Sequence, residues 1–142
     1  SAPDPMADVG EHRFAYSLYP HPGDWRAARI PRKAYEFNVP PLVVEGAWKH
    51  PSLPEGSPFV SVDRGDVIVE TVKMAEKEDA AVVRLFECYN QRGPLTLTFH
   101  KAIRAASECN LLERQDRKLT PAGNRLRLTV QPYEIKTVKV KF

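Results

Sequence analysis

Short segments with alternating apolar and polar residues dominate the second half of the chain. The alternation is clearest over residues 95–100 and 125–130, where every second residue is leucine, phenylalanine or valine. A period of two places apolar side chains on one face of a strand and polar ones on the other. The pattern predicts strands over 59–62, 66–74, 80–89, 94–100, 102–108, 110–114, 124–131 and 134–142. The apolar faces of these predicted strands place six residues in the core, namely Val83, Leu85, Leu97, Phe99, Leu126 and Leu128.

The first forty residues combine one alternating segment with one helical segment. A strand is predicted over 12–19, where aromatic and aliphatic residues alternate with smaller or polar ones. A short helix is predicted over 25–37, because apolar residues recur there on one helical face and Asp24 is a suitable cap. Pro31 forces a kink or a restart in that helix, since proline cannot continue the backbone hydrogen-bond pattern.

These elements predict a mainly β chain, an antiparallel β-sandwich with one short helical segment near residues 25–37. Residues 1–10 are punctuated by proline and are expected to be a linker or a boundary. Residues 11–142 are expected to form one domain, a length that suits a single core. Within it, residues 42–44 suggest another short strand, and residues 45–58, with three prolines and two glycines, suggest a long surface loop.

Charge and composition narrow the function classes. The net charge is +3, and basic residues concentrate in 114–142, where they alternate with apolar rather than aromatic residues. Such alternation is typical of strands whose basic residues face solvent. Because aromatic rings for base stacking do not alternate with these basic residues, no nucleic-acid partner is expected. No apolar run approaches the roughly 18 residues of a membrane-spanning helix, so no membrane partner is expected. Cys88 and Cys109 favour a reducing compartment, although a single bridge between them stays open.

Residues with catalytic potential form no recognisable motif. The four histidines lie far apart in the sequence, and none belongs to a closely spaced ligand pair; they are His12, His21, His50 and His100. The sequence also has no nucleophile elbow, no phosphate-binding glycine loop and no Cys-x-x-Cys pair. A glycosidase needs only two correctly placed carboxylates, which spacing alone cannot identify. We therefore predict no catalytic residue and no metal ligand in this chain.

Two groups of polar residues have alternative interpretations. Residues 7–21 contain two histidines, an arginine and several aromatic rings, a mixture that suits sugar binding or the anchoring of a first strand. Opposite charges on adjacent predicted strands are expected to pair across the ladder rather than to act in catalysis; these are Lys73, Glu76, Arg84 and Glu87. Asn110 is expected to turn the chain, and Glu113 to hold a neighbouring segment.

Six motifs in order carry a family resemblance. They are Ala7-Asp-x-Gly-x-His-x-Phe-x-Tyr-x-Leu-x-Pro-His21, Ala34-Tyr-x-x-Asn-x-Pro, Glu70-Thr-Val-Lys-x-Ala-Glu76, Val83-Arg-Leu-x-Glu87, Asn110-Leu-Leu-Glu113 and Asn124-Arg-Leu. The set resembles the C-terminal β domain of α-mannosidases of glycoside hydrolase family 38, most closely the cytosolic type. The resemblance covers essentially the whole chain.

This resemblance implies a non-catalytic role for the chain. In the family, an N-terminal domain holds zinc and the nucleophilic carboxylate, and a helical domain connects it to this region. The implied reaction of the parent is retaining hydrolysis of terminal α-mannosides. The resemblance thus implies cytoplasmic location, zinc in the absent catalytic domain only, and the catalytic and helical domains as partners.

The opening motif is expected to lie at the interface with the catalytic domain or at the active-site rim, through His12, Arg13, Tyr16 and His21. A free-standing carbohydrate-binding or interaction sandwich is the alternative, in which Trp25, Trp48 and the tyrosines would stack on sugars.

Overall fold

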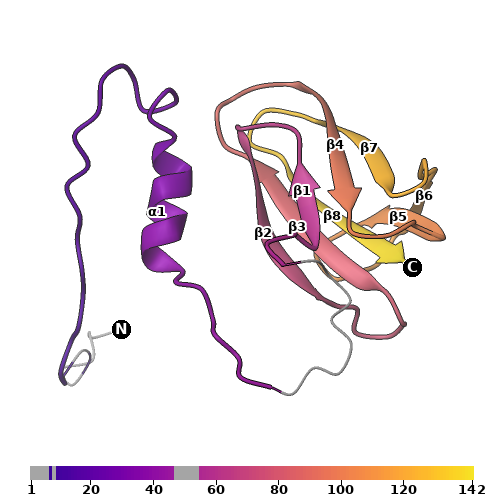
Figure 1. The fold of residues 1–142 in the computed structure, drawn as a ribbon, viewed down its shortest axis with the longest axis horizontal. Helices are drawn as coiled ribbons and strands as arrows, with labels where there is room; N and C mark the ends of the chain where they lie inside the picture. Colours follow the sequence, from indigo (N-terminus) through magenta and orange to yellow (C-terminus); the bar gives the residue numbers. More distant parts are fainter. Residues whose placement is uncertain (1–6, 8, 47–54) are drawn as a thin grey trace, which may run out of the picture.

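Two antiparallel sheets form the body of the computed structural model, which describes residues 7, 9–46 and 55–142 (Figure 1). The described residues contain α1 (Ile30–Asn38), β1 (Val60–Val62), β2 (Val67–Met74), β3 (Ala81–Glu87), β4 (Gly93–Phe99), β5 (Ala105–Cys109), β6 (Arg117–Leu119), β7 (Arg125–Val130) and β8 (Ile135–Lys141). The smaller sheet has the order β1-β4-β7, and the larger has the order β2-β3-β8-β5-β6. The predicted β-sandwich with one short helix is confirmed.

The core lies between the sheets and follows the period-two pattern. In β7 the buried and exposed residues alternate strictly, and in β4 Leu95, Leu97 and Phe99 are the buried positions. All six predicted core residues are buried in one cluster, which also contains valines of β2 and β8. Burial of these apolar side chains supplies the main stabilisation of the fold.

Of the eight strands predicted from residue 59 onward, seven overlap an observed strand, and the prediction over 110–114 is wrong. The Asn110 side-chain oxygen accepts hydrogen bonds from the backbone N–H groups of Leu112 and Arg114, both at 3.0 Å. This local bonding replaces a strand ladder with a turn, as asparagine often does. The predicted roles of Asn110 in turning the chain and of Glu113 in holding a neighbour are confirmed, since Glu113 accepts from the backbone N–H of Glu76 at 2.9 Å.

The expected pairing of charges across the β2–β3 ladder is also wrong. Lys73 lies opposite Val82, and Arg84 lies opposite Thr71. Lys73 instead forms ion pairs with Glu113 at 2.8 Å and with Glu76 of its own segment. The apolar faces of the two strands set their register, and in this register the charged residues do not lie directly opposite one another.

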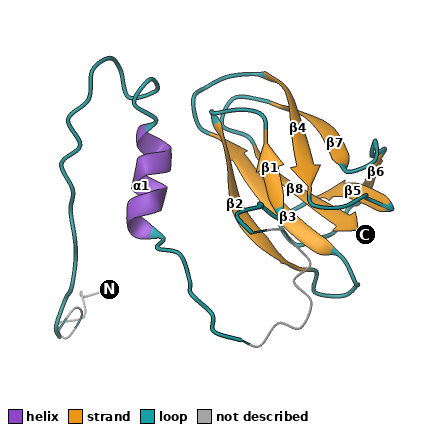
Figure 2. Ribbon diagram, viewed as in Figure 1, coloured by secondary structure: helices purple, strands orange, loops and turns teal. Residues whose placement is uncertain are grey.

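Residues 9–46 form an N-terminal arm that lies beside the sandwich and contains α1 (Figure 2). The predicted strands over 12–19 and 42–44 are wrong, because both segments lack strand structure. An isolated extended segment without a partner strand leaves its backbone groups to water. Most of the predicted loop 45–58, including Trp48 and His50, lies outside the described residues, as do residues 1–6 and 8.

The helix of the arm begins later than the predicted residue 25. Asp24 caps a turn, accepting hydrogen bonds from the backbone N–H groups of Arg26 at 3.1 Å and Ala27 at 2.8 Å. Arg29 then adopts a left-handed conformation with φ of 55°, and α1 restarts with proline in its first turn. The predicted restart at Pro31 is confirmed, because proline is accepted only in the first turn of a helix.

Candidate functional site

The four residues predicted for an interface lie on the extended part of the arm that precedes α1. Arg13 is exposed and pairs with Glu11 at 2.7 Å. His21 lies at the end of this segment, where its ring is 5.8 Å from that of Tyr19. His12 and Tyr16 are exposed. The structure therefore places all four along one segment without gathering them into a pocket.

The arm exposes an unusual amount of apolar surface. Phe14, Tyr16 and Leu18 are 86%, 89% and 90% exposed, and the segment after α1 exposes Leu42 and Val43 almost completely. Single exposed apolar residues are normal on a protein surface, whereas several large ones exposed along one segment are a feature of interaction surfaces. The alternation at 12–19 thus places apolar side chains where the described part of the chain leaves them uncovered.

Helix α1 shares this incomplete burial. None of its residues is buried, although Ile30, Ala34 and Phe37 lie on its apolar side. Together with Ser17 and Tyr19 of the extended segment, they line a groove of about 270 Å³. Because most helical stability in proteins comes from packing of an apolar face, α1 is expected to be completed by further contacts.

Arg32 attaches α1 to the sandwich through the loop before β2 and the first residue of that strand. Its guanidinium donates to the carbonyl oxygens of Gly65 at 3.1 Å, Arg64 at 3.2 Å and Val67 at 2.7 Å. Three backbone acceptors fix the position of the helix more closely than a single contact would. Sequence analysis missed Arg32, because an arginine inside a helical pattern is ordinarily a solvent-facing residue.

Aromatic contacts extend this junction between arm and sandwich. Trp25 contacts Tyr89 edge to face at a centroid distance of 5.2 Å, and Tyr35 lies 5.9 Å from Phe86. The Arg26 guanidinium lies 4.5 Å over the Trp25 ring and donates to the Tyr89 carbonyl oxygen at 3.3 Å. One face of Trp25 is therefore occupied by the junction itself.

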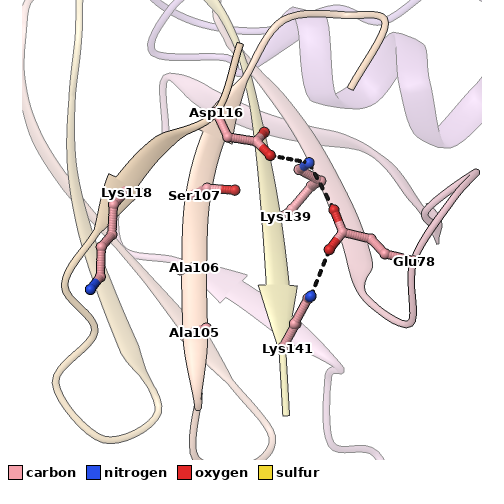
Figure 3. Close-up of a pocket in the computed structure, with 8 residues that line it drawn as sticks. All are labelled: Glu78, Ala105, Ala106, Ser107, Asp116, Lys118, Lys139 and Lys141. Carbon is pink, nitrogen blue, oxygen red and sulfur yellow. Dashed lines mark hydrogen bonds and ion pairs between the residues drawn. The ribbon is translucent and has the colours of Figure 1, made fainter. Parts of the chain in front are cut away.

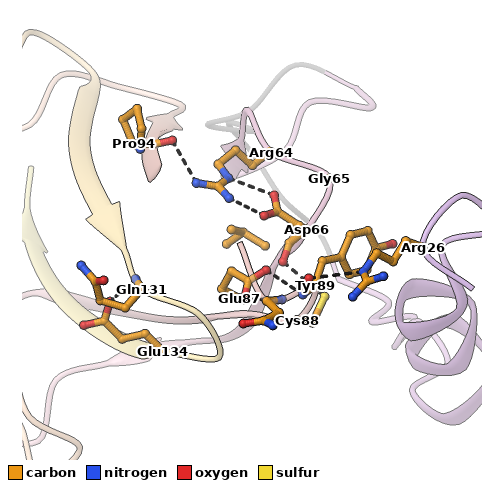
Figure 4. Close-up of polar contacts among 12 residues, drawn as sticks. Arg26, Arg64, Gly65, Asp66, Glu87, Cys88, Tyr89, Pro94, Gln131 and Glu134 are labelled. Atoms are coloured by element: carbon orange, nitrogen blue, oxygen red, sulfur yellow. Dashed lines mark hydrogen bonds and ion pairs between the residues drawn. The ribbon is translucent and has the colours of Figure 1, made fainter. Parts of the chain in front are cut away.

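The loops of the sandwich that face the arm are tied together by carboxylates (Figure 4). Arg64 and Asp66 form a two-point ion pair, which lowers the pKa of Asp66. Beside it, the buried Glu87 accepts hydrogen bonds from backbone N–H groups of two other loops. A cleft of about 410 Å³ lies here, lined by Arg26, Arg29, Arg64, Gly65, Asp66, Tyr89 and Gln91. Its charged groups are largely paired, so it is a junction rather than a reaction site.

A second concave surface lies on the larger sheet (Figure 3). Lys139 pairs with Asp116 at 2.6 Å and Glu78 at 2.8 Å, and Lys141 pairs with Glu78 at 2.6 Å. Burial opposes the charge of Lys139, but the two carboxylates outweigh it and raise its pKa. Lys139 is thereby held as a cation and is not suited to act as a base.

Glu78 provides a test of this network by pH. Hydrogen bonds from Lys139 and Lys141 lower the pKa of Glu78 from 4.5 to about 2. The depressed folded-state pKa means that Glu78 stabilises the fold above its unfolded-state pKa and loses this effect as pH falls toward 2. We expect Glu78→Gln to lower the melting temperature at pH 7, by a difference that shrinks steadily between about pH 5 and pH 2.5.

Thermal melts followed by circular dichroism across this pH range measure the difference. Glu55→Gln, at an exposed glutamate, is the control and should change the melting temperature little at any pH. A Glu78→Gln difference that stays constant from pH 7 to the acid end would contradict the role of its ionised carboxylate.

Nucleophilic and metal-binding groups are poorly placed in the described residues. Both cysteines are free, and burial raises the pKa of each thiol, which keeps them protonated at neutral pH. Within residues 7, 9–46 and 55–142, no three histidine, cysteine, aspartate or glutamate side chains could hold a metal ion. These residues thus do not fit the zinc that the family resemblance implies for the parent enzyme.

Comparisons with known proteins establish the family. Residues 66–138 match the glycosyl hydrolases family 38 C-terminal beta sandwich domain. The chain belongs to this family. It is 37% identical over 139 residues to human Alpha-mannosidase 2C1, covering 94% of this chain and 13% of that protein. The mouse Alpha-mannosidase 2C1 is 34% identical over 142 residues, covering 96% of this chain and 14% of that protein.

A more distant relative shows the same coverage. Alpha-mannosidase G of Dictyostelium discoideum is 30% identical over 144 residues, covering 97% of this chain and 13% of that protein. The chain therefore spans only about an eighth of the length of each of these three relatives. No helix in its described part is long and apolar enough to cross a membrane.

Proposed function

We propose that the chain is the non-catalytic C-terminal β domain of an α-mannosidase and that its N-terminal arm docks on the catalytic and helical domains. The parent reaction in this proposal is the retaining, zinc-assisted hydrolysis of terminal α-mannosides in the cytoplasm. The observation that carries the docking role is the exposed apolar arm, whose helix has no buried residue. Two free cysteines support a reducing compartment.

The extent of the similarity supports a role for the arm beyond the sandwich. The family match begins at residue 66, whereas the relatives align over 94–97% of the chain and so include most of residues 9–46. The arm is thus part of what the chain shares with α-mannosidases. Its partner in this proposal is the remainder of the parent enzyme, since the chain spans only 13–14% of the length of these relatives.

Polar and apolar groups of the arm suit an interface between domains. Such interfaces bury about 600–1,500 Å² and mix apolar contacts with hydrogen bonds. Phe14 and Leu18 would supply apolar contact, while His12 and Arg13 would supply polar contacts at the same segment. A position of Tyr16 and His21 at the active-site rim is the finer form of this proposal.

The test is a His12→Ala/Arg13→Ala double variant of the full parent enzyme. We expect lower mannosidase activity and lower thermal stability, because docking contacts are lost while the sandwich core is untouched. Activity against an aryl α-mannoside and a thermal melt measure both. A raised KM with unchanged kcat would instead assign these residues to substrate binding at the rim.

Two controls make the result specific. Leu112→Ser, at an exposed leucine in the turn between β5 and β6, should leave the parent unchanged. The 142-residue chain with the double substitution should keep the circular dichroism and melting temperature of the unsubstituted chain. Full parental activity and stability in the double variant would refute the docking role of these two side chains.

A further inference from the structure

Two edge strands face each other at the end of the sandwich away from the arm. β7 is an edge of the smaller sheet, and β6 is an edge of the larger sheet. In Figure 1 they lie side by side, with the arm on the opposite side of the body. A groove of about 380 Å³ lies between them, lined by Arg117, Lys118, Leu119, Arg127, Leu128 and Thr129.

The hydrogen-bond pattern shows which backbone groups of β7 face this groove. Thr96, opposite Arg127, accepts from the backbone N–H of Asp63 on the β1 side at 3.3 Å. Pro94, opposite Thr129, likewise directs its carbonyl oxygen to Arg64 at 3.3 Å. In an antiparallel ladder, paired residues that turn their backbone groups away from each other form a non-hydrogen-bonded pair. Arg127 and Thr129 therefore direct their N–H and C=O groups to the free edge.

The turn preceding β7 covers the start of the free edge but leaves the backbone groups of Arg127 and Thr129 unpaired in the described part of the chain; we call residues 127–129 the open stretch. Arg125 is satisfied by Ala122, with which it exchanges two backbone hydrogen bonds of 2.9 and 3.0 Å. Within the described part of the chain, no comparable partner meets the backbone groups of Arg127 and Thr129. The open stretch offers two donors and two acceptors at strand spacing, the arrangement that accepts an added strand.

Side chains around the open stretch define the sequence that would fit. Arg127 lies on the exposed outer face of β7, and Leu128 lies on the inner face, towards the core. Across the groove, Leu119 of β6 packs partly against the same core, beside Lys118. In a strand added at this edge, every second side chain would lie on the outer face beside Arg127, and the others would lie on the inner face beside Leu128 and Leu119. Acidic residues fit the outer positions, and apolar residues fit the inner positions.

We propose that the β7 edge binds an extended segment of another protein in which acidic residues alternate with apolar ones. A second copy of the chain fits poorly, since antiparallel pairing of two β7 edges brings arginines of like charge together. The arm, where the proposed function places the contact with the other domains, lies on the opposite side of the sandwich from this edge (Figure 1). A separate partner with negative charge is the occupant that matches both the charge and the position of this edge.

Fluorescently labelled octapeptides test the proposal with the 142-residue chain. The probe alternates glutamate and valine, and two controls alternate lysine and valine or place the glutamates and valines in separate blocks. We expect saturable anisotropy binding of the first peptide alone, with a Kd below about 1 mM. Binding should weaken as salt rises from about 0.05 to about 0.5 M, because Arg127 and Lys118 attract the glutamates.

Two variants of one residue separate strand addition from simple charge attraction. Thr129→Pro removes an N–H that faces the free edge without removing a hydrogen bond to β4, and Thr129→Ala keeps that N–H. We expect the proline variant to weaken binding by about tenfold or more and the alanine variant to bind like the unsubstituted chain. Circular dichroism melts confirm that both variants are folded before their affinities are compared.

A charge exchange tests the partner's chemistry independently. Arg127→Glu should lose the glutamate–valine peptide and gain the lysine–valine peptide, since it reverses the charge beside the added strand. Equal binding of all three peptides, no saturable binding, or equal affinities of the Thr129→Pro and Thr129→Ala variants would overturn the proposal. So would self-association of Arg127→Val without peptide binding, because the arginine would then only protect the edge.

Discussion

Replacing Phe99 with alanine is expected to lower the free energy of unfolding by about 3–5 kcal/mol. Phe99 is only 2% exposed and lies in the core between the two sheets. Its ring meets Phe142 at 5.6 Å and Phe59 at 6.3 Å, both edge to face. Truncation removes these contacts together with the buried area, and the surrounding strands cannot collapse into the space. Urea denaturation followed by circular dichroism measures the change.

Phe14→Ala is the matched control for this measurement. The same side chain is removed from the extended part of the arm, where Phe14 is 86% exposed. The expected change in unfolding free energy is below about 0.5 kcal/mol, because little area returns to water. A loss below about 1 kcal/mol for Phe99→Ala would mean that its face of β4 is not the core face.

The sequence predicted the sandwich well where burial and strand period agree. In β4 and β7 one face is dry and the other wet, so the alternation identifies both the element and its core side chains. β6 was not predicted, because it has only three residues and its pattern is mainly polar. Its strand structure depends on pairing with β5, a tertiary contact that local sequence does not encode.

The arm shows the limit of the same reasoning. Phe14, Tyr16 and Leu18 alternate as clearly as the residues of β7, yet no strand forms there. Alternation indicates that one face is suited for burial, but it does not say which molecule or domain provides the cover. The predicted strand was wrong, and the same pattern became the main evidence for a docking surface.

Glu87 could not be assigned from sequence, because its partners come from two separate loops. It was expected to pair with a charge on a neighbouring strand, but it accepts hydrogen bonds from backbone N–H groups instead. The donors belong to Tyr89, Asn90 and Tyr133, and the last of these is brought close only by the fold. Asn90 has a φ of 64°, so the loop after Glu87 turns sharply enough to direct its N–H groups back to the carboxylate.

This bonding makes Glu87 a structural acceptor that joins the β3–β4 and β7–β8 connections (Figure 4). The distances from its carboxylate oxygens are 2.6 Å to the Tyr89 nitrogen, 3.1 Å to the Asn90 nitrogen and 2.9 Å to the Tyr133 nitrogen. Because Glu87 is only 1% exposed, water cannot reach these backbone N–H groups to take the place of the carboxylate. Burying a charged group is costly unless it is hydrogen-bonded, as Glu87 is here. The three N–H donors in turn have the carboxylate as their acceptor.

We therefore expect Glu87→Ala to lower the free energy of unfolding by about 2–4 kcal/mol, because three backbone donors lose a charged acceptor. Glu87→Gln should lose less than the alanine variant, since its amide oxygen keeps part of the bonding. Glu70→Ala, at an exposed glutamate of β2, is the control and should change stability by less than about 0.5 kcal/mol. Urea denaturation gives the three values, and amide hydrogen exchange at Tyr89 and Tyr133 should accelerate in the alanine variant. Equal stability of the Glu87 and Glu70 variants would show that the two connections hold together without the buried carboxylate.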